Sequence, residues 1–397
     1  NEFKKLAIFL AAVHDIGKAI VVFQYKIGDK LPERKSALEA SGINFDASHD
    51  KEKAKQTSHA FAGEEILNLL GCPECVSTVV GSHHGVPAES VQDLSWPQKD
   101  IVFYENYYGR DKENIEVLQD IWQTIFDMAL DYAGFLDVSE LPDIDRSSQM
   151  LLSGLLIMAD WLASNTELFP LLSVEDLKPD DKLRAERAWA KLDFPQMWNP
   201  ERSVMSNEDF KETFGFEPRL VQSEVLKIVE NSENPGIYMF EAPMGCGKTE
   251  TSHAASEILT SKCGKNGVFF GLPTQATANG IFPRLISWAE KQSTEFYHSV
   301  QLNHGSATLN SLFQNIQMGI PQEESDSGLI IHNWFCDSKK ACLADFVTAT
   351  VDQMLMLALK RKHVMLLHLG LSEKVVVIDE VHAYDAYMSE YLEMALQ

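Results

Sequence analysis

The stretch Glu241–Thr251 constrains the fold of this chain more than any other part of its sequence. It reads EAPMGCGKTET and follows an apolar run, Ile237–Phe240, that predicts a strand. A glycine-rich turn between a strand and a helix presents backbone N–H groups to phosphate. We therefore predict a phosphate-binding loop for ATP and Mg²⁺, although an alanine stands at the position of the motif's first glycine. The residues predicted to form it are Gly245, Gly247, Lys248, which reaches the β- and γ-phosphates, and Thr249, which holds Mg²⁺.

Two carboxylates follow another apolar run near the end of the sequence. The run Val375–Ile378 predicts a buried strand, and Asp379 and Glu380 come directly after it. A strand that ends in Asp-Glu is common by chance, but here a phosphate loop precedes it in the same chain. We predict that Asp379 holds the Mg²⁺ of ATP and that Glu380 acts catalytically by orienting the attacking water.

Between and around these motifs, short apolar runs alternate with helical segments. Alternation of this kind predicts a parallel sheet with crossover helices, so residues 211–397 are expected to form an α/β lobe. The predicted strands are 236–241, 267–272, 300–303, 346–350 and 375–379.

The first 165 residues have a different pattern, which predicts an all-α domain. Apolar residues repeat at helical spacing from Phe3 to Val13, and Ser58 is a candidate N-cap for a helix that ends at Leu70. Further helices are predicted over 121–132 and 149–164, and a long loop with short pieces over 84–117. Four prolines make 166–210 a predicted linker around one helix, 181–192.

Histidines and aspartates gather in this helical half at the ends of predicted helices. Imidazole and carboxylate groups that converge from several helices are what a divalent transition-metal site needs, and a shared aspartate can bridge two ions that activate water. Taken singly, each histidine is an ordinary core residue and Asp160 a partner in a buried salt bridge. The ordered set makes the metal site the better hypothesis, and its predicted ligands are His14, Asp15, His59, His83, His84 and Asp160.

Composition excludes several classes of protein. The 34 basic and 58 acidic residues give a net charge of −24, which excludes a uniformly basic nucleic-acid coat but not a local basic groove. Six cysteines do not make a disulfide framework, and the lone Cys72-Pro-Glu-Cys75 reads as two ordinary thiols. No membrane span or secretory signal is predicted. These features fit a soluble cytoplasmic protein.

The α/β half resembles the superfamily 2 helicases, whose Asp-Glu-x-His signature matches residues 379–382. The segment Phe216–Gln222 resembles the element that reads adenine, through Gln222. The segments Leu272–Asn279 and Thr348–Gln353 resemble strand-contacting motifs, although each is also explained by a turn or a helix cap. Hydroxyl and amide groups can bind phosphate oxygens without positive charge. The DNA-binding residues that this resemblance implies are Pro273, Thr274, Gln275, Thr350 and Gln353.

The helical half resembles the HD phosphohydrolases, and the whole chain resembles the CRISPR-associated helicase–nucleases that type I Cascade complexes recruit. The likeness lies in VHDIGK (13–18), SHA (58–60), GSHHG (81–85), ADW (159–161) and DEVHAYD (379–385), and is nearest to type I-C members. It implies two divalent transition-metal ions (Mn, Ni, Co or Fe) and the catalytic residues Asp15 and Lys18, of which Lys18 either supports a metal ligand or faces a substrate phosphate. It further implies ATP-driven unwinding and translocation, cleavage of the displaced single strand of an R-loop, and an anti-CRISPR inhibitor as a further partner.

The sequence departs from this family at both ends, where an upstream histidine ligand and the second helicase lobe are absent. We therefore expect this stretch to lack DNA-stimulated ATPase activity while it retains metal-dependent nicking. Two alternatives stay open. One is an HD-type nucleotide phosphohydrolase with a regulatory P-loop NTPase lobe, and the other is a non-catalytic docking module. A nuclease assay with single-stranded DNA separates them.

Overall fold

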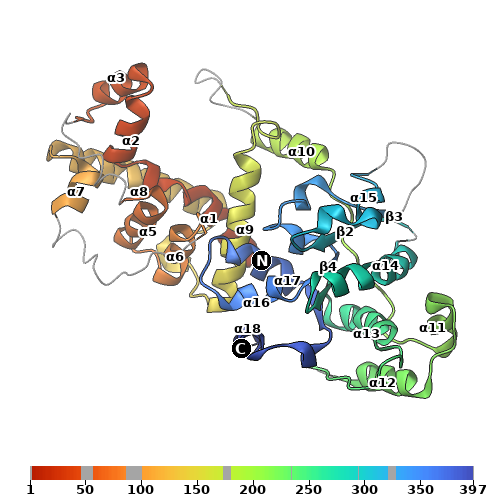
Figure 1. The fold of residues 1–397 in the computed structure, drawn as a ribbon. Coiled ribbons are helices and arrows are strands. Elements are labelled where there is room, and N and C mark those ends of the chain that lie inside the picture. The colour runs from red at the N-terminus through yellow and green to blue at the C-terminus, as the bar shows by residue number, and fades with distance from the viewer. Residues whose placement is uncertain are drawn as a thin grey trace. The chain divides into compact units, whose positions relative to one another are not determined.

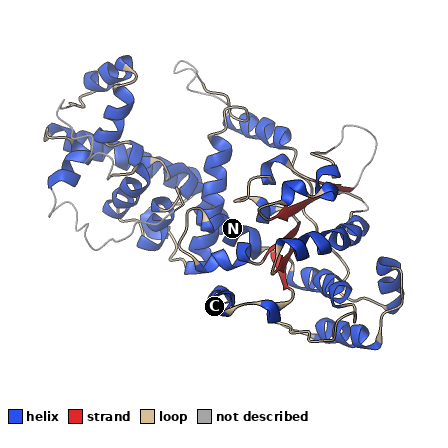
Figure 2. Cartoon of the chain, viewed as in Figure 1, coloured by secondary structure: helices blue, strands red, loops and turns tan. Residues whose placement is uncertain are grey.

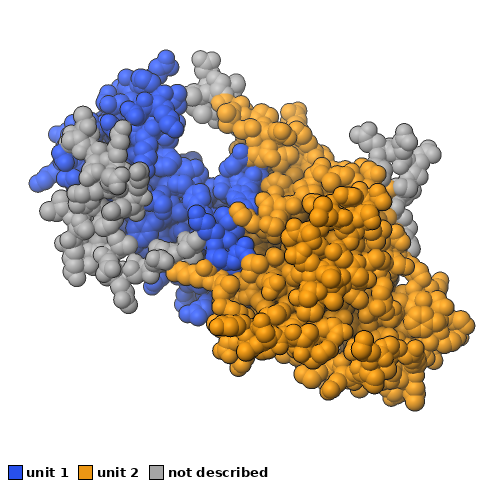
Figure 3. Space-filling view, in the orientation of Figure 1, with its two compact units in different colours: residues 1–164, 361–365 blue, residues 165–360, 366–397 orange. Residues whose placement is uncertain are grey.

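The computed structural model describes residues 2–45, 57–85, 101–172, 180–233, 235–293, 295–320 and 328–396. The chain divides into two units, of which unit 1 comprises residues 1–164 and 361–365 and unit 2 comprises 165–360 and 366–397 (Figure 3). The described strands all belong to unit 2, and unit 1 is helical (Figures 1 and 2). The predicted fold class, an all-α domain followed by a parallel-sheet lobe, is confirmed.

Unit 1 is built around α1, an amphipathic helix that packs against its longer neighbours. Leu6, Phe9, Leu10 and Val13 recur every three or four residues on α1 and are all buried. They join a core that includes Trp122, whose indole Nε1 donates a hydrogen bond to the Ala19 carbonyl at 2.7 Å. The larger helices of unit 1 are α1 (Glu2–Val13), α5 (His59–Leu69), α6 (Glu74–Gly81), α8 (Glu113–Ala133) and α9 (Arg146–Ala163). The smaller ones are η1 (Ile16–Lys18), α2 (Val21–Gly28), α3 (Pro32–Ala40), α7 (Ile101–Tyr108) and η2 (Val138–Glu140).

Local capping signals fix several helix ends where the sequence predicts them. The Ser58 hydroxyl accepts a hydrogen bond from the backbone N–H of Phe61 at 3.2 Å, so α5 begins at His59. The predicted helices 121–132 and 149–164 are parts of α8 and α9. Within the predicted loop 84–117 the structure has α7 and the start of α8, while residues 86–100 lie outside the described residues.

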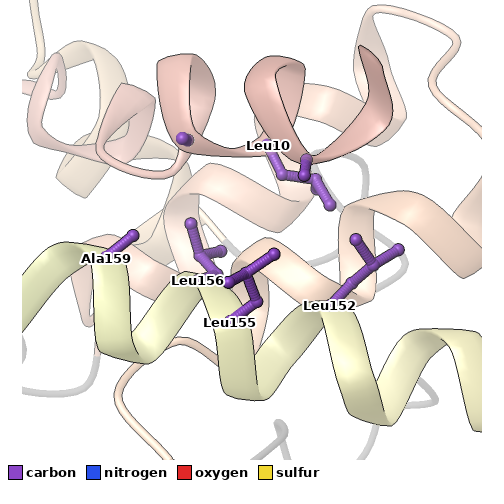
Figure 4. A pocket seen from close by; sticks show the side chains of 7 residues that line it. Leu10, Leu152, Leu155, Leu156 and Ala159 are labelled. Atoms are coloured by element: carbon purple, nitrogen blue, oxygen red, sulfur yellow. The ribbon is translucent and has the colours of Figure 1, made fainter. Parts of the chain in front are cut away.

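A small apolar pocket lies between α1 and α9 (Figure 4). No side chain on its walls can ligate a metal ion or donate a hydrogen bond, so it is separate from the predicted metal site. Its walls are Ala7, Leu10, Ala11, Leu152, Leu155, Leu156 and Ala159.

Unit 2 contains a five-stranded parallel sheet in the order β3-β2-β4-β1-β5. The strands are β1 (Gly267–Leu272), β2 (Tyr297–Asn303), β3 (Gly328–Ile330), β4 (Phe346–Thr350) and β5 (Lys374–Ile378). Four of the five predicted strands are confirmed, and β3 was not predicted because it is only three residues long. All strands run the same way, so the loops after β1, β2, β4 and β5 leave the same edge of the sheet.

Helices connect and cover these strands. In unit 2 they are α10 (Asp181–Leu192), α11 (Asn207–Phe214), α12 (Leu220–Asn231), α13 (Lys248–Cys263), α14 (Gln275–Gln292), α15 (Ser311–Asn315), α16 (Asp352–Leu355), α17 (Val364–Ser372) and α18 (Ala386–Leu396). The first two residues of α17 count with unit 1. Single 3₁₀ turns stand at η4 (Ala307–Leu309), η5 (Asn333–Phe335), η6 (Ala341–Leu343), η7 (Met356–Ala358) and η8 (Val381–Ala383).

The predicted strand 236–241 is wrong. None of the five strands pairs with this segment, which has no regular structure. Its apolar side chains are exposed, Ile237 by 77% and Met239 by 90%. A strand needs a neighbour for its backbone hydrogen bonds, and an apolar pattern alone does not supply one.

The end of the predicted linker is anchored on unit 2 by its backbone. The carbonyl oxygens of Leu192 and Gln196 lie 2.8 and 2.9 Å from ring nitrogens of His332 and His298, respectively. The backbone N–H of Trp198 donates to the buried carboxylate of Asp345 at 3.2 Å. The predicted helix 181–192 within this linker is confirmed as α10, and residues 173–179 lie outside the described residues.

Among the described residues, no single helix is long and apolar enough to cross a membrane. Only a pair of consecutive helical stretches, Glu2–Lys18 and Val21–Gly28, meets the length and composition criteria together, and the pair is bent by 70°. All six cysteines are free, including Cys72 and Cys75.

A fully buried histidine in the core of unit 2 makes the stability of this unit sensitive to acid. His253 on α13 stacks on Trp288 with ring centroids 5.0 Å apart, and its Nε2 has no hydrogen-bond partner among the described residues. Burial, reinforced by the charge of Arg284, lowers the pKa of His253 to about 3. The unfolded chain, with a histidine pKa of about 6.5, therefore binds more protons between these two pKa values.

We expect the free energy of unfolding to fall as the pH drops below about 6.5. At pH 5 the contribution of His253 to this loss is about 2 kcal/mol, because each pKa unit corresponds to about 1.4 kcal/mol. In His253→Phe, which keeps an aromatic ring against Trp288, that part of the loss should disappear. Urea unfolding between pH 4.5 and 8 measures it, with His382→Phe at an exposed histidine as the control. Equal acid sensitivity in His253→Phe and the wild type would contradict the prediction.

Candidate metal centre and nucleotide site

The turn after α1 brings His14 and Asp15 to the start of α5. This requires a glycine at position 17, since a Cβ there would lie 1.9 Å from the carbonyl oxygen of His59 and 2.4 Å from the backbone nitrogen of Gly63. The close approach sets the Asp15 Oδ1 atom 3.5 Å from His59 Nε2. A backbone contact between two elements thus places two of the predicted ligands together.

Three histidines from α5 and from the turn after α6 form the centre of the cluster. One nitrogen of each of His59, His83 and His84 can be chosen so that all three lie within 4.8 Å of one another. The Nε2 atoms of His59 and His84 are 2.7 Å apart, so at most one of these two atoms carries a proton. Burial, together with the neighbouring His84, lowers the pKa of His59 to about 4. A neutral imidazole with a free lone pair is the form that binds metal.

Backbone carbonyls orient two of the imidazoles. Nδ1 of His83 lies 2.6 Å from the Val80 carbonyl oxygen, and Nδ1 of His14 lies 2.8 Å from that of Ala11. In the neutral form of each ring, Nδ1 therefore carries the proton and Nε2 keeps its lone pair. The Nε2 of His83 is buried and has no hydrogen-bond partner among the described residues. This orphaned acceptor beside two further imidazoles fits a bound metal ion.

Two carboxylates complete the arrangement around His14. Its Nε2 atom lies 3.4 Å from Asp15 Oδ2 and 3.6 Å from Asp160 Oδ1 on α9. These separations exceed a hydrogen bond and are close to the roughly 3–3.5 Å between ligand atoms that share one ion at bond lengths of about 2.1 Å. His14 lowers the pKa of Asp160 to about 2. Burial lowers the pKa of His14, but the neighbouring Asp160 and Asp15 carboxylates raise it by more, so the net shift of this pKa is upward.

The predicted HD-site residues therefore come together, with donors from four places in the chain. They are His14 and Asp15 after α1, His59 at the start of α5, His83 and His84 after α6, and Asp160 near the end of α9. Lys18 lies at the edge of the cluster, where its Nζ donates to Asp15 Oδ2 at 2.5 Å. Asp160 is only partly buried, with 20% of its side chain exposed, so it is not the wholly buried carboxylate that its apolar helix suggests.

In unit 2, the predicted phosphate loop precedes α13 as expected. Gly245 and Gly247 have φ of +76° and +83°, which glycine adopts without strain, and Lys248 begins the helix. The Lys248 Nζ donates to the Ala242 carbonyl at 3.1 Å, and Thr249 is buried. The N-terminus of α13 thus directs backbone N–H groups and one lysine toward the same side.

Gln222, predicted to read adenine, contacts this loop directly. It is fully buried, accepts from the backbone N–H of Arg219 at 2.9 Å and donates to the Gly247 carbonyl at 3.1 Å. The Arg219 guanidinium also donates to the Gly245 carbonyl. Sequence reasoning missed Arg219, for which the adjacent glutamine motif was the only signal.

The two predicted carboxylates, Asp379 and Glu380, come directly after β5. The Asp379 backbone N–H donates to Gly271 on β1 at 3.0 Å, and the Glu380 N–H donates to Asp379 Oδ1 at 2.9 Å. Burial raises the pKa of Asp379, while the charge of Lys248 opposes the shift. Glu380 has φ of +55°, a left-handed conformation that is uncommon outside glycine and recurs at functional sites. The structure thus brings the predicted Asp379 near Lys248.

The five predicted DNA-binding residues lie at one edge of the sheet. Leu272 of β1 pairs with Thr350 of β4, so Pro273–Gln275 and Gln353 follow neighbouring strand ends. Thr274 caps α14 by accepting from Thr277, and Gln275 accepts from Ser306 after β2 at 2.6 Å. Thr350 is almost fully buried. The helix cap that was the alternative explanation of Thr274 is therefore confirmed, and its contact with DNA stays a prediction.

Sequence comparisons identify related proteins for both halves of the chain. Residues 1–169 match the family described as "Cas3, HD domain", and residues 215–395 match "Type III restriction enzyme, res subunit". The CRISPR-associated nuclease/helicase Cas3 of Streptococcus thermophilus is 44% identical over 412 residues, which cover 100% of this chain and 44% of that protein. The CRISPR-associated endonuclease/helicase Cas3 of Thermus thermophilus is 30% identical over 411 residues, which cover 98% of this chain and 42% of that protein.

The fold comparison agrees with the sequence comparison. The crystal structure of T. fusca Cas3 with AMPPNP superposes with a TM-score of 0.73 at 26% identity and covers 98% of this chain and 42% of that one. The chain therefore spans less than half the length of the relatives it matches.

Proposed function

This chain belongs to the Cas3 family of CRISPR-associated nuclease/helicases, and on this premise we propose that unit 1 is a metal-dependent nuclease that cuts single-stranded DNA. The observation that carries the proposal is the convergence of His14, Asp15, His59, His83 and His84 with Asp160, three of them with nitrogen atoms inside 4.8 Å. Four imidazoles and two carboxylates suit a divalent transition metal such as Mn, Ni, Co or Fe.

Two ions fit this donor set better than one. Asp15 lies between two groups of ligands, since its Oδ2 faces His14 and its Oδ1 faces His59. Asp15 would then serve as a ligand to both ions, with His14 and Asp160 as further ligands of one and with His59, His83 and His84 as further ligands of the other. Such an ion pair supplies an activated water for in-line attack on a phosphodiester. Lys18, which neutralises Asp15, is available to a substrate phosphate once Asp15 binds metal.

We further propose that unit 2 binds ATP with Mg²⁺ and contributes one lobe to the ATP-driven movement of DNA. Lys248 and Thr249 hold the phosphates and Mg²⁺, Asp379 completes the Mg²⁺ site, and Glu380 orients the attacking water. Gln222 supports the phosphate loop through its hydrogen bond to the Gly247 carbonyl. It recognises adenine if its amide gives up that bond and binds the base instead. Hydroxyl and amide groups after β1 and β4 hold the DNA backbone.

Family membership gives the biological setting of the proposal. The substrate is the displaced single strand of an R-loop, which a type I Cascade complex presents, and an anti-CRISPR inhibitor is a further partner. Degradation of invading DNA places this activity in the cytoplasm. The sequence likeness nearest to type I-C members makes the type I-C complex the first partner to test.

Cleavage of a labelled single-stranded oligonucleotide by this chain tests the proposed nuclease. We expect cleavage with Mn²⁺, Ni²⁺ or Co²⁺ and none with a chelator. Hydrolysis of mononucleotides without DNA cleavage would instead indicate a nucleotide phosphohydrolase. Binding of metal without either activity would indicate a docking module.

A further inference from the structure

A short segment from the second half of the sequence belongs to unit 1. Residues 361–365 lie in the chain between β4 and β5, yet they pack with residues 1–164. At its centre His363 has φ of +61°, a left-handed conformation that is strained for a side chain other than glycine. Such a conformation persists only where the surrounding structure holds it.

The backbone of His363 holds the turn that carries two of the histidines. Its N–H donates to the Gly85 carbonyl at 3.0 Å, one residue after His84. A Cβ at position 85 would lie 2.6 Å from both the backbone nitrogen and Nδ1 of His363. Because Gly85 also has φ of +92°, this position needs glycine for two independent reasons. The backbones of Gly85 and His363 therefore pack so closely that a larger residue at position 85 would separate them.

The ring of His363 contacts the helix that carries Asp160. Its centroid lies 5.0 Å from that of Trp161, the next residue on α9, in an edge-to-face arrangement. One residue thus touches the neighbours of His84 and of Asp160. These two ligands stand on different elements and must keep a fixed separation to share a metal centre.

We infer that His363 is a positioning residue of the metal centre. It holds the His83-His84-Gly85 turn and the Asp160-Trp161 end of α9 at the separation that metal binding needs. The inference rests on the proposed metal-dependent function of unit 1. Loss of a group that supports metal ligands from outside typically weakens metal affinity 10- to 100-fold.

The test measures Mn²⁺ affinity of the whole chain by isothermal titration calorimetry. His363→Gly keeps the backbone N–H, tolerates the positive φ and removes the ring, so we expect about 10-fold weaker Mn²⁺ binding. Trp161→Leu removes the same ring contact from α9 and should weaken binding in the same direction. Lys362→Gly, at the exposed neighbouring position, is the matched control and should bind Mn²⁺ like the wild type.

A second readout separates positioning from a merely structural role. The cleavage rate of His363→Gly should recover to within about twofold of the wild type once Mn²⁺ is saturating. A lower thermal midpoint of the metal-free variant, with unchanged Mn²⁺ affinity in both variants, would overturn the inference. If the wild type binds Mn²⁺ but cleaves no DNA, the proposed nuclease fails, while the affinity comparison still decides the role of His363.

Discussion

Asp15→Ala should reduce cleavage of single-stranded DNA by roughly 10³-fold or more, because metal catalysis supplies several kcal/mol and each 1.4 kcal/mol is tenfold in rate. Among the described residues, Asp15 is the carboxylate that faces both His14 and His59, at 3.4 and 3.5 Å. Its removal therefore takes a ligand from both proposed ions. The initial rate of oligonucleotide cleavage at saturating Mn²⁺ measures the loss.

The controls for Asp15→Ala address folding and charge. Asp29→Ala removes an exposed carboxylate just after α2 and should cleave DNA at the wild-type rate. Thermal unfolding of metal-free Asp15→Ala should match the metal-free wild type, while Mn²⁺ should stabilise only the wild type. Wild-type cleavage by a folded Asp15→Ala protein would refute the two-ion proposal.

Lys248→Ala is expected to weaken ATP binding by roughly 10- to 100-fold, the value of one charge-assisted contact of about 1.5–3 kcal/mol. Lys248 begins α13 at the phosphate loop, where its Nζ donates to the Ala242 carbonyl. Calorimetric titration with ATP and Mg²⁺ measures the change in affinity. The same variant should nick single-stranded DNA at the wild-type rate without ATP, because the proposed nuclease residues are different groups.

The matched control for this second variant is Lys227→Ala, which removes an exposed lysine of α12. It should leave both ATP affinity and nicking unchanged. Loss of ATP-independent nicking in Lys248→Ala would contradict the division of labour between the two sites. Unchanged ATP affinity would remove Lys248 from the proposed nucleotide site.

Features set by neighbouring residues could be predicted from the sequence. Ser58 caps α5 as expected, and β1 and β4 have the predicted bounds, because capping and apolar runs act within a few residues. The strand predicted over 236–241 is wrong, because a strand also needs a partner strand elsewhere in the chain, and neighbouring residues do not reveal whether that partner exists. An apolar pattern reports a preference for burial, and here the side chains are exposed.

In the candidate metal centre, too, the residue types could be predicted from the sequence but their arrangement could not. Residue types and their order pick out six residues that the structure brings together, but their role as metal ligands stays a prediction. Their geometry depends on contacts that no local pattern encodes, such as the Gly17 backbone against His59 and the carbonyls that orient His14 and His83. His363 could not be found from sequence at all, since it lies about 200 residues from Asp160 and its signal is a backbone angle.

The discontinuity of unit 1 has a consequence for synthesis on the ribosome. Residues 1–164 emerge first, and the segment 361–365 follows about 200 residues later. At roughly 5–20 residues per second, this delay is about 10–40 s. During that time the nascent helical domain lacks His363, so its metal centre is expected to load weakly. On this proposal, unit 1 reaches its full affinity for metal only after most of the strands of unit 2 have been translated.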